Sequence, residues 1–149
     1  MTASLPATDP FLATYDGPLS GVLRWEQLDR LWERLRADAA GGWYVYAVGE
    51  VPPTAPVSAD QLLHFVEELD RLLRADHHED YCGIVYADDR EHPGFIKVFD
   101  PHNLGAVCGS SAVPPLPGWI LSKLPPVDLQ VAFPPPGNRR RWWQRLFGS

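Results

Sequence analysis

Residues 81–99, YCGIVYADDREHPGFIKVF, contain the pattern that decides the fold. Two short runs rich in β-branched and aromatic residues, 81–87 and 94–99, flank the polar segment DDREHP. Such runs are typical of β-strands, and the segment between them is longer than a tight two-residue turn. The pattern therefore predicts an antiparallel hairpin with an extended loop.

An amphipathic helix is predicted before this hairpin, over residues 58–78. Ser58 is placed to cap its start, and apolar residues recur at three- and four-residue spacing. The apolar face consists of Leu62, Phe65, Val66, Leu69, Leu72 and Leu73. Further upstream, residues 43–48 (WYVYAV) predict a strand covered on both faces, because the run is apolar without interruption.

A second amphipathic helix is predicted over residues 21–38, with Ser20 as its cap and Gly41 just beyond its end. The spacing that predicts it is that of Val22, Trp25, Leu28, Trp32 and Leu35. After the hairpin, residues 116–124 predict a short helix between prolines. Residues 129–133 (LQVAF) predict a last strand at a sheet edge.

The expected order of elements is α-β-α-β-β-(α). This order indicates a single α+β domain, or a small α/β domain, with helices packed on a mixed sheet. A right-handed helical crossover would make the strands at 43–48 and 81–87 parallel. Because prolines concentrate toward both ends, we expect an irregular segment at 1–18, the domain at 19–133, and a proline spacer with a tail at 134–149.

The composition is that of a folded globular protein, with 45 % hydrophobic residues in 149. The first twenty residues hold no Lys or Arg and no long apolar run, so we expect no signal peptide. No stretch approaches the roughly 18 apolar residues of a membrane helix. These features predict a cytoplasmic protein whose two cysteines are free thiols.

Charge is unevenly distributed along the chain, whose formal net charge is −6. Residues 139–149 carry four arginines and no acid, whereas the remaining 138 residues carry 9 basic and 19 acidic side chains. Nucleic-acid binding depends on neutralising phosphates, and an acidic body repels them. We therefore expect no nucleic-acid partner.

One candidate metal site combines cysteine and histidine, the residues that zinc prefers. Its ligands would be His77 or His78, then Cys82, His102 and Cys108, if the helix end, the hairpin and the segment after it converge. The chain lacks the Cys-x-x-Cys pairs of most structural zinc sites. The alternative is that the histidine is a solvated helix-end residue and that both cysteines are small buried hydrophobes.

A cysteine nucleophile is a second candidate. Cys108 lies in GAVCGSS, where small residues allow backbone N–H groups to approach a substrate carbonyl. His102 could accept the thiol proton and Asp100 could orient the imidazole. The alternative is structural, because DPHNLGAV (100–107) is rich in turn-forming residues.

Other catalytic patterns have less support. Asp88, Asp89 and Glu91 lie together in the hairpin loop, where carboxylates are expected to be solvated and not raised in pKa by burial. The scattered acids do not form an EF-hand loop. Neither glycine-rich phosphate motif occurs, so the sequence gives no indication of nucleotide binding.

The C-terminal tail, RRRWWQRLFGS, follows a proline spacer. Trp and Arg are enriched at binding hot spots, and the same residues suit an anionic membrane surface. The candidate contact residues are Arg139, Arg140, Arg141, Trp142, Trp143, Arg145, Leu146 and Phe147. The alternative is that the tail packs back on its own acidic body.

These observations predict a non-enzymatic accessory, assembly or regulatory protein that binds another protein through its tail, with peripheral membrane contact as an alternative. The other hypothesis is a metal- or thiol-dependent site, or a cysteine-nucleophile enzyme, centred on Cys82, His102 and Cys108. We expect no cofactor under the first hypothesis and zinc under the second. The sequence names neither the partner nor the oligomeric state.

Overall fold

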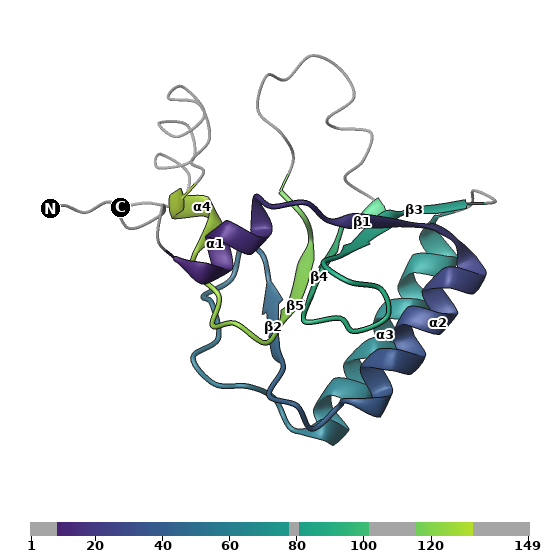
Figure 1. Ribbon diagram of the computed structural model, residues 1–149, viewed down its shortest axis with the longest axis horizontal. Coiled ribbons are helices and arrows are strands. Elements are labelled where there is room, and N and C mark those ends of the chain that lie inside the picture. Colours follow the sequence, from purple (N-terminus) through teal and green to yellow (C-terminus); the bar gives the residue numbers. More distant parts are fainter. Residues whose placement is uncertain (1–8, 78–80, 102–115, 133–149) are drawn as a thin grey trace, which may run out of the picture.

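The computed structural model describes residues 9–77, 81–101 and 116–132 (Figure 1). Helices and strands alternate along much of the chain and build a five-stranded sheet with helices on both of its faces. The elements are α1 (Pro10–Tyr15), β1 (Ser20–Arg24), α2 (Trp25–Ala37), β2 (Tyr44–Ala47), α3 (Ala59–Asp76), β3 (Tyr81–Ala87), β4 (Phe95–Val98), β5 (Trp119–Ser122) and α4 (Leu129–Ala132).

The sheet has the strand order β1-β3-β4-β5-β2, and each pairing is antiparallel. The predicted α+β class is confirmed. The expectation of a mixed sheet with parallel strands at 43–48 and 81–87 is wrong, because β2 and β3 are not neighbours. Two strands that the sequence did not predict explain this: β1 occupies the free side of β3, and β5 separates β4 from β2.

The chain between Ser20 and Arg24 is a strand and not the first turn of the predicted helix 21–38. Val22 pairs with Val85 of β3, so its burial is satisfied by the sheet. Helix α2 begins only at Trp25. The side-chain oxygen of Gln27 accepts hydrogen bonds from the backbone N–H groups of Leu23 and Arg24, each at 3.0 Å, which closes the start of the helix.

Helix α3 confirms the predicted helix and its cap. Ser58 Oγ accepts from the backbone N–H of Gln61 at 3.2 Å, and Gln61 Oε1 accepts from the backbone N–H of Ser58 at 2.9 Å. Helices α2 and α3 lie side by side on one face of the sheet (Figure 1). Their buried residues are Leu28, Leu31, Trp32 and Leu35 of α2 and Leu62, Val66, Leu69 and Leu73 of α3.

Strands β3 and β4 confirm the predicted hairpin, and strand β2 confirms the strand at 43–48. Loop acids organise the hairpin connection. Asp88 Oδ1 accepts from the backbone N–H groups of Asp89, Gly94 and Phe95 at 2.8–3.1 Å. Asp89 in turn accepts from the backbone of the next turn, which lowers the pKa of its carboxyl group. These acids therefore have a structural role as turn formers.

Two predictions near the end of the chain are wrong. Residues 116–124, predicted as a helix, contain strand β5, and residues 129–133, predicted as a strand, contain helix α4. Strand β5 is buried between β4 and β2, an environment that suits its Trp-Ile-Leu run. Asp128 starts α4, since its Oδ1 accepts from the backbone N–H of Gln130 at 2.9 Å.

The second face of the sheet is covered by α1 and α4 (Figure 1). The sequence analysis treats residues 1–18 as irregular and so misses α1. Asp9 caps this helix, since its Oδ1 accepts from the backbone N–H groups of Phe11 and Leu12 at 2.8 and 3.1 Å, and Pro10 suits the first helical position. The second-face cluster comprises Phe11, Leu12, Tyr46, Phe95, Ile120 and Leu129.

We expect the substitution Phe11→Ala to lower the free energy of unfolding by about 3–5 kcal/mol. Phe11 is fully buried, and its ring centroid lies 5.3 Å from that of Phe95 and 6.4 Å from that of Tyr46. Denaturant unfolding followed by tryptophan fluorescence measures the change. The control is Ala13→Ser on the exposed side of the same helix, for which we expect a change of about 0.5 kcal/mol or less. Equal effects of the two substitutions would contradict a core role for α1.

Candidate functional site

Of the residues that the sequence predicts for a metal or catalytic site, the structure describes Cys82, Asp100 and His77, the alternative to His78. His78, His102 and Cys108 lie outside the described residues, as does the predicted tail contact at 139–147. The convergence of Cys82, His102 and Cys108 therefore stays a prediction.

Cys82 lies near the start of β3, with none of its surface exposed, among the apolar side chains under α2 and α3. Burial raises the pKa of its thiol, although hydrogen bonds from the backbone N–H groups of Ile84 and Val85 act in the opposite direction. A raised pKa keeps the thiol protonated at neutral pH, whereas a metal ligand or nucleophile must be a thiolate. The surroundings of Cys82 are those of a small core residue.

A polar network joins the ends of α2 and α3 beside Cys82. Asp70 accepts hydrogen bonds from Trp32 Nε1 at 3.0 Å and from Arg74 Nε at 2.9 Å. The same Arg74 reaches Asp29 of α2 at 2.6 Å and lies 5.0 Å from the centroid of the Trp25 ring. Asp70 and Arg74 of α3 thus both bond to side chains of α2. We therefore interpret the network as a structural clamp between α2 and α3.

His77, the residue after α3, lies against the same clamp. Its Nε2 is 2.8 Å from the backbone oxygen of Cys82, and its ring centroid is 6.0 Å from that of Trp25. The contact with the Cys82 carbonyl needs the Nε2 proton, so this nitrogen is engaged with the backbone. His77 thus anchors the end of α3 to β3.

Asp100 follows β4 and lies against the chain just before β5. A Cβ placed on Gly118 would lie 3.1 Å from the Asp100 Cβ, so the absence of a side chain at Gly118 permits this close approach. The proposed partner of Asp100 in catalysis, His102, is outside the described residues. Asp100 thus lies at the start of the β4–β5 connection, against Gly118 at its end, and its catalytic role stays a prediction.

A different polar side chain, Lys97 of β4, stands out on the second face of the sheet. The registers place Tyr86 of β3 directly opposite Lys97 on one side and Ile120 of β5 opposite it on the other, so the three side chains share a face. Ile120 is fully buried beneath the second-face helices, whereas Tyr86 and Lys97 are half-buried. Lys97 thus lies at the border of the covered half of this face.

Three aromatic rings surround the Lys97 ammonium. The distances from Nζ to the ring centroids are 4.6 Å for Tyr15, 5.9 Å for Tyr86 and 5.6 Å for Phe99. Burial lowers the pKa of Lys97, and the negative charge of Asp16 partly opposes this. The pKa of Tyr15 is raised to about 12, first by burial and then by the negative charge of Asp16. Its phenol is therefore protonated at neutral pH.

The sequence contained part of the signal for this cluster. In the predicted strand 94–99, Lys97 alternates with Ile96 and Val98, which places it on the opposite face from these two residues. The pairing with Tyr86 and the approach of Tyr15 could not be predicted, since one depends on hairpin register and the other on a helix that the sequence analysis missed.

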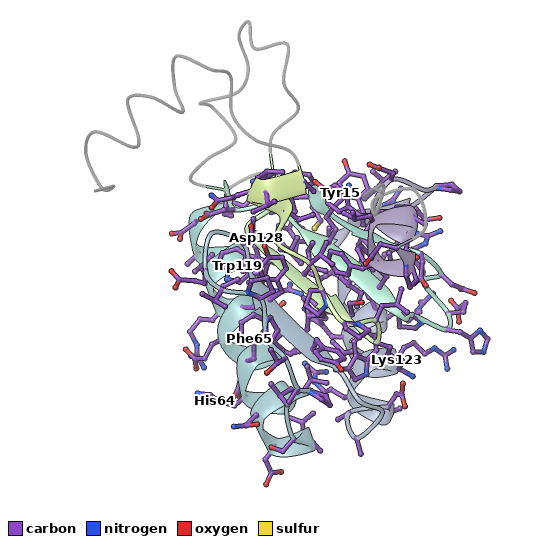
Figure 2. All side chains as sticks on the ribbon, turned by 90° about the vertical axis from the view of Figure 1, so that its left-hand side faces the viewer. Tyr15, His64, Phe65, Trp119, Lys123 and Asp128 are labelled. Atoms are coloured by element: carbon purple, nitrogen blue, oxygen red, sulfur yellow. The ribbon has the colours of Figure 1, made fainter. Side chains whose placement is uncertain are left out.

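A group of three metal-ligating residues lies on the surface of α3. His64, Glu67 and Glu68 have ligand atoms within 4.8 Å of one another. All three side chains are exposed, and Figure 2 shows His64 pointing away from the body of the protein. Glu68 also pairs with Arg71 of the same helix. Such an arrangement is common on solvated helices, so we assign no metal to it.

Large apolar side chains are exposed at a few described positions, notably Val51 (86 %), Val131 (76 %) and Leu23 (61 %). Val51 belongs to the proline-rich connection after β2, and Val131 to α4. The two segments are adjacent, because a Cβ placed on Gly49 would lie 4.0 Å from Gln130 Nε2. Leu23 is on β1, at the other edge of the sheet from β2.

Comparison with known proteins yields no relative: no family model, curated protein or solved structure matches the chain. Within the described ranges, no helix has the length and apolar character needed to cross a membrane.

The buried position of Cys82 predicts slow thiol modification. In the native protein at mildly alkaline pH, we expect iodoacetamide to label Cys82 far more slowly than in the protein unfolded in guanidinium chloride, because the folded thiol is inaccessible and protonated. Mass spectrometry of proteolytic peptides measures labelling at Cys82 separately from Cys108. Rapid native labelling at Cys82 would mean that its sulfur reaches solvent, as an active thiol requires.

Proposed function

We propose that this protein acts by binding another protein, and that the tail residues 139–147 contribute to the contact surface together with exposed apolar side chains of the domain. An accessory, assembly or regulatory role is the function that fits a binding protein of this kind. The observation that carries the proposal is the exposure of Val131, one residue before the end of α4, and of Val51 on an adjacent segment.

The position of these two valines supports the proposal. Helix α4 ends at Ala132, so the segment that leads to the tail begins two residues after Val131. Isolated exposed apolar residues are normal on proteins, but Val51 and Val131 are both more than three-quarters exposed and lie on adjacent segments. With the two tryptophans of the tail, they would provide the apolar centre that protein interfaces require.

The charge of the domain supports a protein partner over a nucleic acid. The described ranges contain 9 basic and 17 acidic side chains. Several of the basic residues are already paired: Arg34 with Glu91, Arg71 with Glu68, and Lys123 with Asp38. A surface of this kind offers few free cations to a phosphate backbone.

The thiol- or metal-dependent alternative receives less support from the described residues. It requires a thiolate at Cys82, and Cys82 lies in the core with its thiol pKa raised by burial. Whether His102 and Cys108 form a site without Cys82 is a separate hypothesis, which the labelling of Cys108 by the same reagent addresses.

Deletion of residues 137–149 separates external binding from self-docking. If the tail binds a partner, we expect the truncated protein to keep the midpoint of thermal unfolding of the full chain, because every core element of the described ranges lies before the deleted residues. If the tail covers its own domain, the loss of buried apolar surface should lower the midpoint by several degrees, as about 1–2 kcal/mol would. Differential scanning calorimetry measures the difference.

Affinity capture from an extract of the native host tests binding itself. We expect a specific partner to be enriched by the full chain and lost with the double substitution Trp142→Ala and Trp143→Ala, and to be weakened by Val131→Asp. Leu23→Asp is the matched control, since it adds the same charge at an exposed apolar position on the opposite edge of the sheet. Equal losses for Val131→Asp and Leu23→Asp, or binding only to anionic vesicles, would contradict the proposal.

A further inference from the structure

The chain has only two lysines, Lys97 and Lys123, beside eleven arginines, and the two lysines have different surroundings. Lys123 follows β5, forms an ion pair with Asp38 and lies 5.4 Å from the centroid of the Trp43 ring. Lys97 is enclosed by three rings on the second face of the sheet. Figure 2 shows Lys123 well separated from Tyr15, whose ring contacts Lys97.

The carboxylate partner is what distinguishes the two sites. Contact with a ring face favours an ammonium over a neutral amine, so the rings are not the source of the reactivity expected at Lys97. In the described part of the chain, Asp38 forms an ion pair with Lys123, whereas no carboxylate oxygen lies within 4.0 Å of Lys97 Nζ. A half-buried amine without a carboxylate partner loses its proton more readily, and the neutral amine is the nucleophile.

We propose that Lys97 is the reactive amine of a small ring-lined site, which we call the Lys97 site (Lys97, Tyr15, Tyr86 and Phe99), and that it condenses with uncharged aldehydes to form an imine. This activity is separate from the protein-binding function proposed above. The Lys97 site also lies on the opposite face of the sheet from Cys82, which is buried under α2 and α3.

The reaction needs no cofactor. The Nζ lone pair forms a bond to the carbonyl carbon while the carbonyl electron pair moves to oxygen, which takes up a proton. Loss of the nitrogen protons and departure of water then give a C=N bond, so amine and aldehyde yield imine and water without oxidation or reduction. The protonated phenol of Tyr15 leaves the wall of the site uncharged.

The lining of the site indicates the class of aldehyde. Two tyrosine rings and one phenylalanine ring offer apolar faces to an aromatic or aliphatic group. The carboxylate of Asp16 is close enough to influence both Lys97 and Tyr15, and it would repel a ligand with its own negative charge. An uncharged aromatic aldehyde therefore fits better than a carboxylated one.

Reductive trapping tests the proposal on the full-length protein. Benzaldehyde is added at neutral pH with cyanoborohydride, which reduces the imine to a stable secondary amine, and peptide mass spectrometry follows each lysine over time. We expect Lys97 to be modified several-fold faster than Lys123, and benzaldehyde to react faster at Lys97 than 4-formylbenzoate does. The N-terminal amine, which reacts at its own rate, is mapped separately.

Two variants test whether the ion pair with Asp38 accounts for the slower reaction expected at Lys123. Asp38→Asn removes the carboxylate partner of Lys123 and should raise the rate at Lys123 without changing that at Lys97. Lys123→Arg should leave Lys97 as reactive as before. The proposal is overturned if Lys97 reacts no faster than Lys123 in the native wild-type protein, or if Lys97 reacts only after unfolding. It is also overturned if the two aldehydes react equally at Lys97.

Discussion

The sheet is apolar on both faces, and this constraint determines where every helix lies. In β4, Ile96 and Val98 are fully buried on one face, and Phe95 is 1 % exposed on the other. A strand with this pattern cannot leave either face in water without exposing large apolar surface. Helices α2 and α3 cover one face, and the short helices α1 and α4 cover the other.

The helices cover the two faces of the sheet to different extents, and the smaller cover on the second face leaves the Lys97 site half-buried. Helices of 13 and 18 residues lie on the first face, whereas the helices on the second face have 6 and 4 residues. Across the second face, Ile120 and its neighbour Tyr46 are fully buried, but Tyr86 and Lys97 toward β1 are half-buried. At the edge, Gly21 leaves room for the Tyr86 ring, since a Cβ there would lie 3.2 Å from it.

The sequence predicted the elements whose signals are local. Helix α3 has both a capping box and a regular apolar stripe, and the hairpin has two strand-like runs around a polar loop, so both were predicted correctly. Strand β1 was mistaken for the start of α2 because Val22 fits the helical spacing of Trp25 and Leu28. Val22 belongs to a strand because it pairs with Val85. Since Val85 lies far along the chain, the sequence around Val22 does not reveal this pairing.

The candidate site shows the same division between local and non-local information. Cysteine and histidine attract attention in a sequence because of their chemistry, yet the fold places Cys82 in the core and turns His77 toward the backbone. A lysine, by contrast, does not by itself indicate a reactive site in a sequence. Its surroundings come from three separate parts of the chain: Tyr15 on α1, Tyr86 on β3 and Phe99 after β4.

The choice of lysine at position 97 has a physical reason in a chain that otherwise prefers arginine. A guanidinium keeps its charge at any physiological pH, so it needs a carboxylate or solvent wherever it is placed. Arg34 of α2 and Arg71 and Arg74 of α3 each form an ion pair with a carboxylate. Lysine can give up its proton, and it is therefore the strongly basic side chain that suits a half-buried, ring-lined position with no carboxylate oxygen within 4.0 Å among the described residues.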